Sequence, residues 1–259
     1  DFTRASMITL IKLTLGFFSD KPLNLTTIHD YCTKRTLQGV KNSTINRELN
    51  IIRAAINFYN KNNDDNVKNP FNGFNLFEAD YLPRYLSPNE CSRLLEASKS
   101  YNNEQLYHFI NLALNTGCRS GELKQLTWES VNIDKRYMVV RNSLSKNRKT
   151  IYKPLNNQAM TSIQALHNGS QWVFYNEQTR QHRKTFRKGF ITSCERAKLG
   201  HVRIHDLRHT FASLLVQNGV PLYHVMQLLG HSDIKTTQKY AHLSPNNLAH
   251  VVDSLPQFA

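Results

Sequence analysis

Apolar residues recur every three or four positions in the first part of the chain, which is the period of an amphipathic helix. This pattern predicts three helices, at residues 7–18, 27–39 and 44–58, the last with Ser43 as its N-cap. Three helices on a small core can form an independent unit. The segment that follows, 60–75, is polar and rich in asparagine, which indicates a loop or linker.

The longer remainder of the chain mixes helical and extended patterns. The motif S-P-N-E at 87–90 combines a capping box with proline at the first helical position, and so marks a helix start. Two short extended patterns, 138–142 and 150–155, flank the basic segment 143–149 and predict a β-hairpin, while residues 171–175 predict a further strand. Further helices are predicted at 104–115, 205–219, 222–229 and 247–255.

One more helix is expected before the last of these, with Ser232 as its N-cap and with Tyr240 on it. Together the patterns predict a mainly α protein. We expect a helical domain at 1–75, a linker at 76–85, and a mixed, mostly helical domain at 86–259 with a small antiparallel β-sheet and a C-terminal helix.

Positive charge dominates the sequence, because 33 Lys and Arg face 19 Asp and Glu, which gives a formal net charge of +14. Such an imbalance favours a polyanionic partner, and nucleic acid is the first candidate; a merely basic surface is the alternative. The segment 180–203 is especially basic. On a helix, Arg183 with Arg187 and Lys184 with Lys188 would be like-charged i, i+4 pairs, which repel unless a polyanion lies alongside. A solvated run of charge remains the other interpretation.

Cysteine use and hydropathy indicate a protein of the cytoplasm. The four cysteines are far apart and form no C-x-x-C pair, which is typical of reduced thiols rather than of a disulfide framework or a zinc site. They are Cys32, Cys91, Cys118 and Cys194. No apolar run reaches the roughly 18 residues that a membrane span requires. The chain begins at Asp1 instead of Met, which indicates a fragment or a processed chain.

Histidine and arginine gather between residues 203 and 243. His205 and Arg208 are three positions apart, so on a helix both project from one face, where an imidazole and a guanidinium suit a phosphate. Gly-His follows at His231, and Tyr240 comes nine positions after that histidine. The segment resembles the carboxy-terminal signature of the tyrosine recombinases, the phage integrase family, in which His-x-x-Arg, Gly-His and a nucleophilic tyrosine occur in this order.

Two further motifs agree with the resemblance. T-G-C-R-S-G-E-L at 116–123 resembles the first arginine box of the family, T-G-x-R-x-x-E-L, although a surface pair of Arg119 and Glu122 is the alternative. Family members carry a catalytic lysine on a β-hairpin, and Lys146 fits that position. Its competitors are Lys149 and Arg148, and a solvated hairpin tip is the other interpretation.

The resemblance implies a site-specific DNA recombinase that cleaves and rejoins DNA strands through a 3′-phosphotyrosine intermediate and so integrates or excises a mobile element. The site residues that it implies are Arg119, Lys146, His205, Arg208, His231 and Tyr240, with Glu122 in a supporting role. The arginines would bind the phosphate, the lysine would protonate the leaving 5′-hydroxyl, His205 would accept the proton of Tyr240, and His231 would hydrogen-bond the phosphate. No cofactor and no metal are expected, because the cations are side chains.

The resemblance also implies partners. Residues 1–75 would be a core-binding domain that contacts DNA, and 86–259 the catalytic domain. The expected DNA-binding residues are Arg148, Lys149, Arg183, Lys184, Arg187, Lys188 and Arg203. The expected partners are a double-stranded DNA attachment site, a homo-tetramer formed on DNA through the C-terminal helix, and accessory DNA-bending or excision proteins, with no membrane. We expect the protein to be cytoplasmic and DNA-associated, in a prokaryote or encoded by a phage.

Three other interpretations stay open at this point. H-D-L-R-H at 205–209 imitates the H-E-x-x-H motif of zinc proteases, but Arg208 would oppose a dication. Residues 222–240 imitate the helix-turn-helix of a repressor. A repressor would not explain why the six site residues all occur in the order of the family. A type IB topoisomerase shares the active-site chemistry, although the compact spacing and the helical first domain favour an integrase.

Overall fold

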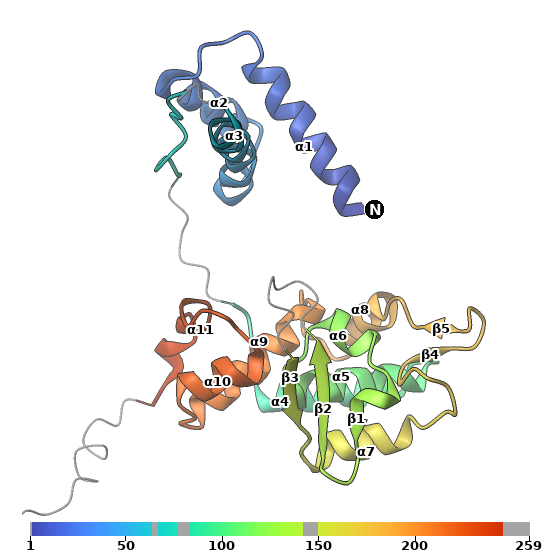
Figure 1. Cartoon of the computed structure of the whole chain (residues 1–259). Helices are drawn as coiled ribbons and strands as arrows, with labels where there is room; N and C mark the ends of the chain where they lie inside the picture. Colours follow the sequence, from blue (N-terminus) through green and yellow to red (C-terminus); the bar gives the residue numbers. More distant parts are fainter. Residues whose placement is uncertain (1, 64–66, 77–82, 142–149, 246–259) are drawn as a thin grey trace, which may run out of the picture. The chain divides into compact units, whose positions relative to one another are not determined.

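A computed structural model describes residues 2–63, 67–76, 83–141 and 150–245 of the chain. The chain divides into two compact units, Asp1–Tyr81 and Leu82–Ala259, each with its own hydrophobic core (Figure 1). The boundary falls within the segment 76–85, for which the sequence predicts a linker.

The described residues of the first unit form three helices (Figure 1): α1 is Phe2–Phe18, α2 is Leu25–Leu37 and α3 is Asn42–Asn62. The side chain of Asn24 caps α2 by accepting the backbone N–H of Thr27 at 2.9 Å. The predicted N-cap of the third helix is wrong, because α3 begins one residue before Ser43, with Lys41 as its N-cap. Lys41 makes no side-chain cap hydrogen bond, so packing of α3 rather than a cap sets this boundary.

The core of the first unit includes a buried polar contact and an irregular segment. Glu48 is fully buried and accepts hydrogen bonds from Tyr31 at 2.8 Å and from Arg35 at 2.9 Å. The segment 67–76, within the region predicted as a loop, has no helix or strand, yet Phe71 is fully buried in the core of this unit. Arg53 on α3 donates to the backbone carbonyl of Phe71 at 2.6 Å. Part of the predicted loop is therefore packed against α3.

The second unit is mostly helical and contains two small antiparallel sheets (Figure 1). Its helices are α4 Pro88–Lys99, α5 Glu104–Thr116, α6 Ser120–Lys124, α7 Asn157–Ala165, α8 Arg187–Arg196, α9 Ile204–Gln217, α10 Leu222–Leu229 and α11 Lys235–Gln238, with short 3₁₀ helices η1 Trp128–Ser130 and η2 Ala241–Leu243. One sheet joins β1 Val131–Asn132, β2 Tyr137–Arg141 and β3 Thr150–Pro154 in that order, and the other joins β4 Tyr175–Asn176 and β5 Gln181–His182. The prediction of a mainly α fold with a small antiparallel sheet is confirmed.

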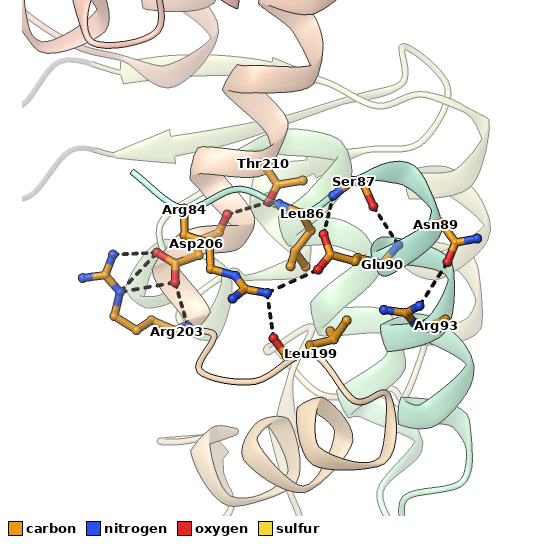
Figure 2. A network of polar contacts seen from close by, with 10 residues as sticks. All are labelled: Arg84, Leu86, Ser87, Asn89, Glu90, Arg93, Leu199, Arg203, Asp206 and Thr210. Atoms are coloured by element: carbon orange, nitrogen blue, oxygen red, sulfur yellow. Dashed lines mark hydrogen bonds and ion pairs between the residues drawn. The ribbon is translucent and has the colours of Figure 1, made fainter. Parts of the chain in front are cut away.

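Local signals set several of these boundaries. The capping box at Ser87 is formed, because its hydroxyl accepts the N–H of Glu90 at 3.2 Å and Glu90 accepts the N–H of Ser87 at 2.8 Å (Figure 2). In the core, α5 packs against α4, α7 and α9. The ring of Phe109 on α5 is stacked on that of Phe186, with centroids 4.3 Å apart. The centre of the unit is therefore α5, whose C-terminal end leads into the site.

Three local predictions in the second unit are wrong. Residues 171–175 form no continuous strand, since Trp172 makes only an isolated bridge to Thr127 and β4 begins at Tyr175. Ser232 caps no helix, because the N-cap of α11 is Ile234, and Tyr240 lies just after α11 instead of on it. The helix predicted at 247–255 lies outside the described residues.

Candidate active site

The turn between α5 and α6 directs Arg119. Gly117 ends α5 with a left-handed backbone, at φ 61°. A Cβ atom there would lie 2.4 Å from the ring of Phe211 on α9, so glycine is what allows α5 and α9 to approach this closely. Arg119 is the N-cap of α6, and Glu122 accepts hydrogen bonds from its backbone N–H at 2.7 Å and from its Nη1 at 2.9 Å. The carboxylate of Glu122 therefore holds the guanidinium of Arg119.

Arg208 connects two helix ends. It lies on α9 and only 3% of its surface is exposed. Its Nη1 donates to the carbonyl oxygen of Gly117 at 2.8 Å, and its Nη2 donates to that of Leu229, at the end of α10, at 2.7 Å. Carbonyl groups at helix C-termini carry partial negative charge and favour a cation. Burial and then repulsion from Arg119 lower the pKa of Arg208 to about 10, which leaves it protonated at neutral pH.

A second buried cation, Lys153, makes a parallel connection. It lies on β3 with 1% of its surface exposed, and its Nζ donates to the carbonyl oxygens of Thr116, at 3.2 Å, and Leu228. Burial is the main reason that the pKa of Lys153 is lowered. Sequence reasoning missed this residue. The alternation of side chains along a strand could have identified it, because Lys153 shares the buried face of β3 with Ile151.

His231 is positioned by the end of α10. Gly230 closes that helix at φ 68°, and a Cβ atom there would lie 2.0 Å from Ile151 on β3, so glycine allows this contact. The Nδ1 atom of His231 is 2.8 Å from the hydroxyl oxygen of Thr237 on α11. Burial, followed by the positive charge of the two site arginines, lowers the pKa of His231 to about 3. Its ring is therefore neutral and lies within the field of both guanidinium groups.

The hydroxyl of Tyr240 contacts a histidine that sequence reasoning did not select. Tyr240 is 1% exposed, and its ring belongs to a small apolar cluster of α9 and α10. Its Oη is 2.6 Å from Nδ1 of His209, which is also buried. The ring of His205, one turn earlier on α9, lies 4.8 Å from the ring of His209 at an interplanar angle of 88°. The structure thus places His209 within hydrogen-bond distance of the tyrosine oxygen, with the ring of His205 next to that of His209.

Both histidines of α9 are in surroundings that disfavour a positive charge. Burial, then the charges of Lys239 and His205, lower the pKa of His209 to about 4. Burial, then the charge of Arg208, also lowers the pKa of His205. The signal for His209 was present in H-D-L-R-H, because two histidines four positions apart share one helix face.

The first turn of α9 is fixed by a network of polar contacts (Figure 2). Asp206 accepts the backbone N–H of Arg203 at 2.8 Å and pairs with its guanidinium at 2.7 Å. Thr210 donates its hydroxyl to the carbonyl of Asp206 at 2.7 Å and accepts the N–H of Leu86 at 2.9 Å. Burial alone would raise the pKa of the Asp206 carboxyl, but the bonds from Arg203 outweigh burial and keep the pKa below its ordinary value. The network holds the helix that carries Arg208 and the two histidines.

The structure brings five of the six predicted site residues into one region of the second unit. Arg208 lies between the helix ends that precede Arg119 and His231, because it donates to the carbonyl oxygens of Gly117 and Leu229. The charges of both arginines lower the pKa of His231, and the charge of Arg208 lowers that of His205. The five are Arg119, His205, Arg208, His231 and Tyr240. The predicted catalytic lysine and its neighbours, Lys146, Arg148 and Lys149, lie outside the described residues.

The basic segment before α8 differs from its predicted form. Arg183 and Lys184 precede α8, which begins at Arg187, so the predicted helical pairs of like charge do not form. The Nε of Arg183 donates to the side chain of Gln105 at 3.2 Å, whereas Lys184, Arg187 and Lys188 are exposed. Arg203, also predicted to bind DNA, is ion-paired with Asp206 and its side chain is 48% exposed.

The arrangement of ligand-type residues argues against the zinc-protease interpretation. The carboxylate of Asp206 is bonded to Arg203, and no group of three His, Cys, Asp or Glu side chains could hold a metal within the described part of the chain. All four cysteines are free thiols. Among the helices in the described ranges, none has both the length and the apolar character needed to cross a membrane.

Comparison with known proteins identifies the family. Residues 84–247 match the model of the phage integrase family, and since this match covers more than half of the chain, the chain belongs to that family of tyrosine recombinases. The integrase of Salmonella phage P22 is 31% identical over 188 residues, which cover 66% of this chain and 48% of that protein. Tyrosine recombinase XerC of Pediococcus pentosaceus is 28% identical over 226 residues, with 80% of this chain and 73% of that protein covered.

A solved structure has the same fold over nearly the whole chain. The integrase of transposon Tn1549, in complex with circular intermediate DNA, matches with a TM-score of 0.79 at 21% identity and covers 98% of this chain and 94% of that chain. The match to the P22 integrase spans about half of that protein's length.

Proposed function

We propose that this protein is a site-specific DNA recombinase that cleaves and rejoins DNA strands through a covalent 3′-phosphate bond to Tyr240. The observation that carries the proposal is the placement of the tyrosine hydroxyl in the same cluster as Arg119, Arg208 and His231. Family membership supports the same activity. A repressor would not need a buried phenol held among arginines and histidines.

The chemistry follows from the charges of the cluster. Attack of the Tyr240 oxygen on a DNA phosphorus builds negative charge on the non-bridging oxygens, and the guanidinium groups of Arg119 and Arg208 stabilise that charge. His231 is neutral and hydrogen-bonds the phosphate. A histidine of α9 takes the proton of the phenol, whose ordinary pKa is about 10. Lys146 protonates the departing 5′-oxygen.

Rejoining is the same step in reverse. The 5′-hydroxyl of a new strand attacks the phosphotyrosine, the bond from phosphorus to Tyr240 breaks, and the tyrosine recovers its proton. A phosphotyrosine retains most of the energy of the bond that it replaced, so the exchange requires no nucleotide cofactor. Capture of a new partner strand separates recombination from the relaxation that a type IB topoisomerase performs.

DNA binding would use the positive charge of the whole chain, which totals +14. We assign the phosphate contacts of the second unit to the exposed residues Lys184, Arg187 and Lys188, with Arg183 and Arg203 beside them, and to Arg148 and Lys149. The first unit, with its own helical core, is assigned to DNA contact as the core-binding domain. The substrate is a double-stranded attachment site of a mobile element.

Assembly and cellular setting are part of the same proposal. We assign the residues after Tyr240 to contact with a second copy, which gives a homo-tetramer on two paired DNA sites. Accessory DNA-bending or excision proteins would choose between integration and excision. The protein would act on DNA in the cytoplasm of a prokaryote.

The test is covalent trapping on DNA. Sites selected from a random DNA library by binding to the protein are rebuilt as nicked suicide substrates, which lose the 5′-hydroxyl fragment after cleavage. We expect a protein–DNA adduct on a denaturing gel, with the 3′-phosphate on Tyr240 by mass spectrometry. Tyr240→Phe should abolish the adduct and leave DNA affinity within about twofold, because the phenylalanine preserves the ring and removes only the nucleophile.

Two results would contradict the proposal. Specific binding of the wild-type protein without any adduct would favour the repressor interpretation. An adduct that reseals only to its own strand, even when a partner strand is offered in excess, would favour a topoisomerase.

A further inference from the structure

A polar neighbour of the attacking oxygen is a histidine outside the family signature used above. The Oη of Tyr240 lies 2.6 Å from Nδ1 of His209, and both side chains are almost completely buried, with 1% and 4% of their surfaces exposed. This distance is at the short end for a hydrogen bond between a hydroxyl and a ring nitrogen. The contact is therefore built into the core of the protein rather than made at its surface.

Packing keeps the two groups together. The ring of Tyr240 lies in an apolar cluster with Ala212 and Val216 of α9 and with residues of α10. His209 is on the same helix as Ala212 and Val216, so one helix carries both the imidazole and part of the apolar surface around the phenol ring. A reacting pair that is already aligned avoids much of the entropic cost of the reaction.

The other groups around His209 decide which proton state can act. Lys239 and His205 oppose a positive charge on the ring, and Arg203 does so more weakly, while Asp206 favours one. Burial is the largest effect, and together these groups lower the pKa of His209 to about 4. The ring is therefore neutral near pH 7. A neutral imidazole with Nδ1 facing the hydroxyl is ready to accept a proton.

We propose that His209 is a catalytic residue of strand cleavage, which accepts the hydroxyl proton of Tyr240 at Nδ1 as the phenolic oxygen bonds to phosphorus. This inference rests on the function proposed above. In the same step the bond from phosphorus to the 5′-oxygen breaks, and that oxygen takes a proton from Lys146. On rejoining, His209 returns its proton to Tyr240 as the bond from phosphorus to the tyrosine breaks. The chain thus gains one proton at His209 and loses one at Lys146.

His205 then has a different task. Its ring lies edge to face with that of His209, with centroids 4.8 Å apart, and the charge of Arg208 contributes to lowering its pKa. His205 is therefore near both the proton acceptor and the phosphate-binding arginine. We assign to it a hydrogen bond to the phosphate. His205 and His209 can therefore be distinguished by the kind of defect that each substitution causes.

The decisive variant is His209→Asn. The asparagine Oδ1 occupies nearly the position of the histidine Nδ1 and can accept the same hydrogen bond, but it cannot take the proton. At saturating DNA we expect the first-order rate of adduct formation to fall about 100-fold or more, the usual contribution of a general base. DNA affinity should stay within about twofold, because the side chain is buried.

A matched control is His108→Asn. His108 is also in a helix of the second unit, and its Nδ1 is 3.1 Å from the hydroxyl of Ser162, outside the site. Loss of this imidazole should leave adduct formation within about threefold of wild type, since no reacting group is touched. Equal defects in His108→Asn and His209→Asn would point to a structural effect and overturn the proposal.

Chemical rescue distinguishes loss of the proton donor to the leaving group from loss of the proton acceptor for Tyr240. A substrate with sulfur in place of the bridging 5′-oxygen has a leaving group that needs no proton, so it should restore Lys146→Ala and leave His209→Asn slow. Replacement of Tyr240 by 3,5-difluorotyrosine, whose phenol is more acidic, should recover at least about tenfold of the rate in His209→Asn. Rescue by sulfur, or rescue by fluorotyrosine in His205→Asn but not in His209→Asn, would overturn the assignment.

A measurement on the wild-type protein tests the same proposal if the His209→Asn variant fails to fold. Orthovanadate bound with the two DNA fragments that flank the cleavage point imitates the five-coordinate phosphorus. With ¹⁵N-labelled histidine, His209 should change from a neutral to a doubly protonated ring when this complex forms at neutral pH. A ring that stays neutral would contradict the proposal.

The outcomes also distinguish this inference from the proposed function. If the wild-type protein forms no adduct, the recombinase function fails whatever His209 does. If the wild-type protein forms the adduct and His209→Asn forms it equally fast, only the role of His209 fails.

Discussion

At the scale of single residues, the site is dominated by cations and by imidazoles that are kept neutral. Arg208 and Lys153 remain buried because helix-end carbonyls receive their N–H groups. His231 and His209 stay neutral because burial and neighbouring positive charges lower the pKa of each ring. A DNA phosphate that enters this region adds negative charge beside these cations.

The lowered histidine pKa values predict a stability that depends on pH. The pKa of His209 is about 4 in the folded chain and 6.5 ordinarily, so between these pH values the unfolded chain binds more protons. Stability should be complete above about pH 6.5 and should fall as the pH decreases towards 4, by about 1–2 kcal/mol at pH 5 for each of His209 and His231.

Urea unfolding of the DNA-free protein at pH 7 and pH 5 measures this loss. His231→Gln should reduce the pH dependence, because it removes one of the buried, neutral imidazoles. A free energy of unfolding that is equal at the two pH values would contradict the buried, neutral histidines.

At the scale of elements, the site is assembled where helix ends meet. The C-terminal ends of α5 and α10 both terminate in left-handed glycines, and each glycine allows a close contact, with α9 at Gly117 and with β3 at Gly230. The two ends are then joined through Arg208 and Lys153. The position of His231 depends on this geometry, because it directly follows Gly230.

Gly230→Ala tests the helix-end contact. The new Cβ would collide with the Ile151 side chain and would require a left-handed alanine, so we expect a loss of about 1–3 kcal/mol in the free energy of unfolding, together with slower adduct formation. Ile151→Ala in the same chain should relieve the collision but not the backbone strain. The double variant should therefore lose less stability than the two single losses added together. Additive losses by urea unfolding would show that the two side chains do not meet.

The elements also show what the sequence could predict. The start of α4 follows from the capping box at Ser87, and the end of α5 from Gly117, because these signals act within a few residues. The strand predicted at 171–175 is wrong because a bridge at Trp172 and loop packing, rather than a full ladder, bury that apolar stretch. Lys153 and His209 escaped prediction because their partners lie far away along the chain.

At the scale of the whole molecule, two units with separate cores share one chain. The apolar cluster around Ile28 and Leu49 belongs to the first unit, and the larger one around Phe109 belongs to the second. All site residues that the structure describes lie in the second unit. We therefore expect the second unit to fold and to perform the chemistry by itself, whereas a large part of the DNA affinity should depend on the first unit.

The isolated segment 83–259 tests this division. It should unfold cooperatively, because it contains the complete second core, and it should still form the Tyr240 adduct. Its DNA affinity should be at least about tenfold weaker and less sensitive to salt, because fewer phosphates are contacted. Circular dichroism, adduct gels and binding at two salt concentrations provide the readouts. Unchanged affinity would show that the first unit does not contact DNA.

The two cations that join α5 to α10 also make the site dependent on complete folding of the second unit. Arg208 comes from α9 and Lys153 from β3, and the carbonyls that hold them come from α5 and α10. α5 and β3 are far in the sequence from each other and from α9 and α10, and these segments meet only in the folded second unit. A chain whose second unit is incomplete or unfolded lacks these contacts, and so we expect it to form no adduct with DNA. The site is therefore available for chemistry only after the second unit has folded completely.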